Sequence, residues 1–68
     1  MSHDATPSSR RFLIAECFLV NLLGLDETVA AREMLAWGVA LSSDSEKAVW
    51  DLLGRPTHCP HGESIPAP

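Results

Sequence analysis

The sequence predicts an all-α fold, in which three short helices are followed by an ordered, proline-rich tail. Apolar residues recur at helical rather than alternating spacing, and residues that can cap a helix stand before each apolar segment. Glycine follows the first and the third segment, as is typical of helix ends. A chain of 68 residues buries only about 60% of its unfolded surface. We therefore expect association with another chain to stabilise the fold.

The first helix is predicted from about Arg10 to Leu23, after a polar leader of residues 1–9 that we expect to be flexible. Ser8 or Ser9 can serve as its N-cap. The apolar side chains of this helix lie around nearly its whole circumference, and such a helix must be covered on more than one side. Because two short helices can cover only part of it, the sequence predicts an exposed apolar surface for a partner.

The second helix is predicted from about Glu27 to Leu41. Gly24 can end the preceding helix, because glycine adopts the left-handed conformation that a helix terminus favours. Asp26 is the predicted N-cap of the second helix, and the negative charge of Glu27 suits the positive end of the helix dipole.

The third helix is predicted over about residues 44–53. Ser43 and Glu46 have the spacing of a capping box, in which the hydroxyl and the carboxylate satisfy each other's backbone N–H groups. Gly54 ends the helix, and residues 54–66 form the tail loop. We thus predict one domain over residues 10–66.

Composition excludes several classes of function. Nine acidic residues oppose five basic ones, for a net charge of −4, and the basic residues form no stripe that could neutralise phosphates. The longest apolar stretch contains Glu16 and Asn21 and is too short to span a bilayer. Two cysteines without a signal peptide predict a cytoplasmic protein rather than a disulfide-stabilised secreted one. No nucleophile with a positioned base and no phosphate loop is recognisable, so we do not expect an enzyme.

Three motifs in order carry a family resemblance. They read Glu16-x-Phe18-Leu19-Val20-x-x-Leu23-Gly24-Leu25-Asp26, then Ser42, then Leu52-Leu53-Gly54-Arg55-Pro56-Thr57-x-Cys59-Pro60-His61-Gly62-x-x-Ile65-Pro66. This series resembles the metal-binding and dimerisation domain of iron- or manganese-dependent repressors of the diphtheria toxin repressor family. The resemblance covers about Arg10 to Pro66 and implies a dimerisation module. We expect a stand-alone module, because the winged helix-turn-helix that precedes this domain in the family is absent from the sequence.

The resemblance also implies which positions held the metal ligands of the family. Those positions are Phe12, Glu16, Ala31, Leu35, Gly38 and Val39. Only Glu16 retains a donor group, and one carboxylate does not hold a divalent ion against water. We therefore predict that the inherited metal sites are lost, and that the apolar replacements fill the emptied pockets.

The tail offers the only other metal-ligand candidates. His58, Cys59 and His61 are zinc-type ligands, but neighbouring positions in a proline-containing loop cannot easily surround one tetrahedral ion. We interpret this segment as the loop that folds the tail back across the helices. The apolar setting of Cys17 likewise predicts an unreactive thiol.

The predicted function is association without a cofactor. We expect a symmetric homodimer, with mixed dimers with a full-length metal-dependent repressor as a further possibility and no direct contact with nucleic acid or membrane. The predicted interface residues are Phe12, Ala15, Phe18, Leu19, Leu22 and Trp37. One alternative is a small protein that binds iron, manganese or zinc through Glu16, His58, Cys59 and His61. Another is a gene remnant without a role.

Overall fold

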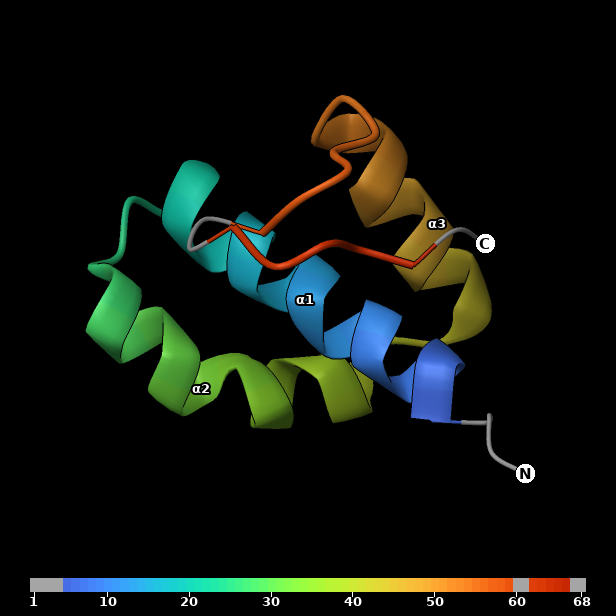
Figure 1. Ribbon diagram of the computed structural model, residues 1–68, viewed down its shortest axis with the longest axis horizontal. Helices are drawn as coiled ribbons and strands as arrows, with labels where there is room; N and C mark the ends of the chain where they lie inside the picture. Colours follow the sequence, from blue (N-terminus) through green and yellow to red (C-terminus); the bar gives the residue numbers. More distant parts are fainter. Residues whose placement is uncertain (1–4, 60–61, 67–68) are drawn as a thin grey trace.

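The computed structural model describes residues 5–59 and 62–66, and it contains three helices in those residues. They are α1 (Ala5–Asn21), α2 (Glu27–Ala40) and α3 (Ser43–Leu52). Helix α1 lies between the other two, and the tail that follows α3 returns across α1 (Figure 1). Within the described residues the only strand-like pairing is an isolated bridge between His58 and Ser64. The predicted all-α fold is confirmed.

Helix α1 begins at Ala5, well before the predicted start at Arg10. Pro7 therefore lies in the first turn of the helix. The first four N–H groups of an α-helix have no partner within the helix, so the missing N–H of a proline costs nothing there. The sequence-based prediction read Pro7 as part of a flexible leader, and the helix instead includes it. Residues 1–4 of that predicted leader lie outside the described residues.

The connection between α1 and α2 follows the prediction. Gly24 has a φ of 74°, in the left-handed region, and the Leu25 N–H donates to the Leu19 carbonyl at 3.0 Å. Asp26 caps α2, because its carboxylate accepts a hydrogen bond from the Thr28 N–H at 2.9 Å.

The cap of α3 differs from the prediction. Ser42 is the N-cap, and its hydroxyl accepts from the Ser45 N–H at 3.1 Å. The predicted capping box of Ser43 and Glu46 is wrong because Glu46 pairs instead with the guanidinium groups of Arg10 and Arg11. A long-range ion pair thus takes the carboxylate that the local pattern assigned to the cap.

The core surrounds α1. Most of the side chains that are nearly inaccessible to solvent come from this helix, namely Leu13, Ile14, Ala15, Cys17 and Leu19, together with Ala30 of α2 and Cys59 and Ile65 of the tail. Helix α1 is therefore largely covered by its own chain. The surplus of apolar surface that the sequence predicts for α1 lies mainly elsewhere, because the exposed large apolar residues are Leu22, Leu23, Leu35, Trp37, Val39 and Leu52.

The tail is fastened to the helices at several points. The Trp50 indole N–H donates to the Pro56 carbonyl at 3.1 Å, and Arg10 Nε donates to the Pro66 carbonyl at 3.0 Å. Between these points Ile65 is buried in the core, and its N–H donates to the Thr57 carbonyl at 2.8 Å. These contacts place the tail against α1 and tie it to α3.

Candidate functional site

An apolar face is formed where the three helices meet. The rings of Phe18 and Trp37 have centroids 5.4 Å apart and are tilted by 45°, an arrangement that aromatic pairs favour. Beside them is an open pocket of about 80 Å³, lined only by the apolar residues Ala15, Phe18, Trp37, Leu41 and Val49. Leu22 lies one helical turn after Phe18 on the same side. We call Phe18, Leu22, Trp37, Leu41 and Val49 the Trp37 face.

The six predicted interface residues do not share one environment. Leu22 and Trp37 are exposed, and Phe18 and Phe12 are half-buried. Ala15 and Leu19 are 2% and 0% exposed, so in this monomer they form part of the core and present almost no surface to a partner. Of the six, Ala15, Phe18 and Trp37 line the pocket. Leu41 and Val49, which were not among the predicted interface residues, complete it from outside α1.

A second apolar surface lies on another flank of α2. It consists of three exposed residues of α2 spaced four apart, which we call the Leu35 stripe: Ala31, Leu35 and Val39. Trp37 is two residues from both Leu35 and Val39, about 200° around the helix. The expectation that Ala31, Leu35 and Val39 fill emptied metal pockets is wrong, because Leu35 and Val39 are 58% and 71% exposed. The spacing alone could not reveal which flank of α2 the rest of the chain covers.

The remaining inherited metal positions lie inside the molecule. Glu16 is 0% exposed, and Gly38 is buried against the ring of Phe12. A Cβ atom at Gly38 would overlap the Phe12 ring, so the two helices approach each other closely only because this residue has no side chain. Of the six positions, Glu16 alone carries a donor side chain.

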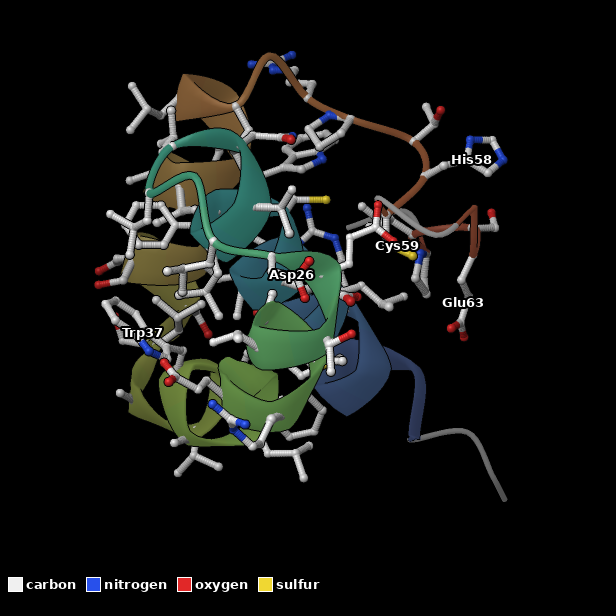
Figure 2. All side chains as sticks on the ribbon, turned by 90° about the vertical axis from the view of Figure 1, so that its left-hand side faces the viewer. Asp26, Trp37, His58, Cys59 and Glu63 are labelled. Atoms are coloured by element: carbon white, nitrogen blue, oxygen red, sulfur yellow. The ribbon has the colours of Figure 1, made fainter. Side chains whose placement is uncertain are left out.

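The tail candidates do not share one environment. His58 is exposed, whereas Cys59 is buried in the core, and Figure 2 shows the two side chains with Glu63 on the side of the molecule away from Trp37. His61 lies outside the described residues. Within residues 5–59 and 62–66, no group of three or more His, Cys, Asp or Glu side chains is arranged to hold a metal ion.

The sequence did not predict a polar cluster that forms around Arg10. Arg10 is 5% exposed, pairs with Glu46 of α3, and places its guanidinium 4.8 Å from the centre of the Trp50 ring. Neither the i, i+4 spacing nor any motif connects Arg10 with Glu46, because the pair joins two different helices. On the exposed side of α3, hydrogen bonds from Lys47 and Arg55 hold the pKa of Asp51 below its usual range.

The described part of the chain contains no helix with both the length and the apolar character needed to cross a membrane. A helical core and an apolar face around an open pocket characterise a small domain suited to association. Residues 5–67 match the family described as iron dependent repressor, metal binding and dimerisation domain. The chain belongs to this family, which is regulatory.

A solved structure shares the fold of this chain. The chain is similar to the hypothetical protein SSo2273 from Sulfolobus solfataricus, with 25% sequence identity and a TM-score of 0.86. The similarity covers 94% of this chain and 49% of SSo2273, so the present chain spans about half the length of that protein. Among functionally curated proteins, none matches the chain significantly.

Proposed function

We propose that this chain self-associates, and that its homodimer forms through the Trp37 face. The observation that carries the proposal is the open, wholly apolar pocket between the three helices, which Trp37 lines while 39% of it stays exposed. Leu22, one helical turn after Phe18, is exposed as well. A two-fold axis would bring the same face of each subunit into contact, so that each covers the apolar surface of the other. Tryptophan is among the residues that contribute most to binding when an interface buries them.

The Trp37 face revises the interface that the sequence predicts. Ala15 and Leu19 support the face from beneath, because both are buried in the monomer. Leu22, Trp37 and the neighbouring walls of the pocket supply the contact area. This revision keeps the predicted involvement of the first two helices and adds Val49 of α3.

Sedimentation equilibrium across a concentration series tests the proposal. Leu22→Asp places a charge at the Trp37 face, and we expect it to raise the dimer dissociation constant by at least about tenfold, which corresponds to about 1.4 kcal/mol. Leu35→Asp is the matched control, because Leu35 is also an exposed leucine, at 58% against 47% for Leu22, and lies on another flank. A wild-type chain that stays monomeric at every concentration contradicts the proposal, as does a greater effect of Leu35→Asp.

We further propose that the inherited metal positions no longer hold a metal. The support is that five of the six positions carry Phe12, Ala31, Leu35, Gly38 and Val39, none of which has a donor side chain. Titration with Fe(II), Mn(II) or Co(II) should show no tight stoichiometric binding. The family description includes metal binding and so favours the alternative, a small metal-binding protein. Stoichiometric metal in the purified protein that Glu16→Ala removes would establish that alternative.

A regulatory role follows if these 68 residues also form mixed dimers with a full-length repressor of the same family. Such a dimer would carry a DNA-binding domain on one subunit only, and loss of half the contacts weakens binding to a palindromic operator. We propose this non-catalytic role in the cytoplasm. Titrating the chain into a repressor–operator complex should lower the DNA affinity, and Leu22→Asp should abolish the effect. An unchanged operator affinity at saturating wild-type chain would refute the role.

A further inference from the structure

Two buried thiols meet where the tail crosses α1. Cys17 of α1 and Cys59 of the tail are both free, are 1% and 4% exposed, and belong to the same buried cluster with Leu13, Ile14 and Ile65. The Cys17 thiol donates to the carbonyl of His58 with a sulfur–oxygen distance of 3.7 Å. His58 directly precedes Cys59, so the Cys17 sulfur touches the peptide unit that leads into Cys59.

This contact and the shared buried cluster place the two cysteines near each other in the fold. A disulfide between them would bring their Cα atoms to about 4.4–6.8 Å from each other. Cys59 is outside the helices, and its N–H donates to the Glu63 carbonyl at 2.8 Å. The pKa of Cys17 is raised to about 11, chiefly by burial and further by the neighbouring Cys59, which agrees with their proximity.

We propose that Cys17 and Cys59 form an intramolecular disulfide when the protein meets hydrogen peroxide, and that this bond locks the tail onto α1. One thiolate first attacks the peroxide, so that its sulfur becomes a sulfenic acid and one water is released. The second thiolate then attacks that sulfur and releases the second water. In sum, the two thiols lose two protons and two electrons, and the peroxide takes them up to become two molecules of water.

Burial decides the order of these steps. The thiolate is the reactive form, and the buried environment of Cys17 disfavours it. Cys59 leaves the core whenever the tail undocks, because it belongs to the tail, whereas Cys17 stays on its helix. Cys59 therefore reacts with peroxide first, and the bond forms when the tail returns to Cys17. The Pro56 carbonyl of the tail accepts a hydrogen bond from the Trp50 indole of α3. The disulfide would therefore also restrain α3, whose Val49 forms a wall of the Trp37 face.

The test compares how readily the bond forms in the folded and the unfolded chain. The full wild-type chain is equilibrated with reduced and oxidised glutathione, in buffer and in concentrated urea, and the disulfide is quantified by the loss of two hydrogen atoms in the intact mass. We expect the equilibrium constant for closing the bond to be at least about tenfold larger in buffer, because the fold holds the thiols together. Equal constants, or a larger one in urea, would overturn the proposal.

Peroxide treatment of the wild-type chain provides the second arm. The oxidised wild-type protein should remain a single chain on a non-reducing gel and should yield one peptide pair joined through Cys17 and Cys59. Bonds between two chains, or sulfinic acid at Cys59 without a disulfide, would contradict the lock. Cys17→Ser and Cys59→Ser are the controls, since neither can lose two hydrogen atoms.

Discussion

Gly38→Ala tests the close approach of α1 and α2. A Cβ atom at this position would overlap Cδ1 of Phe12 and would lie 2.7 Å from its Cε1 and 3.2 Å from its Cα. The aromatic ring can rotate or move, but the Cα belongs to the backbone of α1, so the two helices must separate slightly. The substitution therefore disturbs the packing of the whole α1–α2 pair.

Two opposing effects set how much Gly38→Ala changes the free energy of unfolding. Alanine is favoured over glycine within a helix by about 1 kcal/mol, whereas overpacking of a core usually costs about 1–3 kcal/mol. Because the clash involves backbone as well as ring, we expect the packing cost to exceed the propensity gain. The net loss in the free energy of unfolding is then up to about 2 kcal/mol, which lowers the Tm of a domain of this size by up to about 16 °C.

A double-mutant cycle with Phe12→Ala tests whether the Phe12 ring causes the loss of stability. In a Phe12→Ala background the ring is gone, so Gly38→Ala should become neutral or stabilising by up to about 1 kcal/mol. Urea unfolding of the four chains measures both effects, and one protein concentration keeps the conditions of association the same for all of them. A larger free energy of unfolding for Gly38→Ala in the wild-type background would refute the close contact.

Three further perturbations have defined outcomes. Ser42→Ala should cost about 1 kcal/mol by thermal unfolding, while Ser43→Ala should change stability by less than about 0.5 kcal/mol; equal costs would argue against Ser42 as the cap. Ile65→Ala should cost about 2–5 kcal/mol and raise the rate of amide exchange at the N–H of that residue, and an unchanged stability would mean that the tail contributes little. The pKa of Cys17 rises from 9.0 to about 11 on folding, so the unfolded chain loses this proton first as the pH increases. The corresponding stability is fully present below pH 9 and declines towards pH 11, and Cys17→Ala should show a shallower decline over that range in urea unfolding.

Local chemistry predicted much of this fold. Asp26 and Gly24 have the conformations expected of them, because a short acidic side chain before a helix and a glycine after one act on their immediate neighbours. Gly54 likewise has a φ of 87° at the end of α3. Such features are determined within one or two turns of chain, which is the range over which a sequence pattern is informative.

Features that depend on distant segments were not predictable in the same way. The role of Glu46 depends on Arg10, which is 36 residues away, and the pocket beside Trp37 gains one wall from each helix. The exposure of Leu35 and Val39 depends on which flank of α2 faces α1, and a helix with apolar residues on several flanks does not reveal this. For the candidate site, the sequence therefore identified residues of α1 and α2 but not the partners that complete the pocket.

The positions of the two tryptophans give this protein a pair of built-in optical reporters. Trp37 is at the edge of the apolar pocket, whereas Trp50 is half-buried and donates its indole N–H to the tail. Fluorescence from a chain that keeps only Trp37 would shift when another subunit displaces water from that ring. Emission from a chain that keeps only Trp50 would instead follow the docking of the tail. The two events can thus be followed separately in solution, without any attached dye.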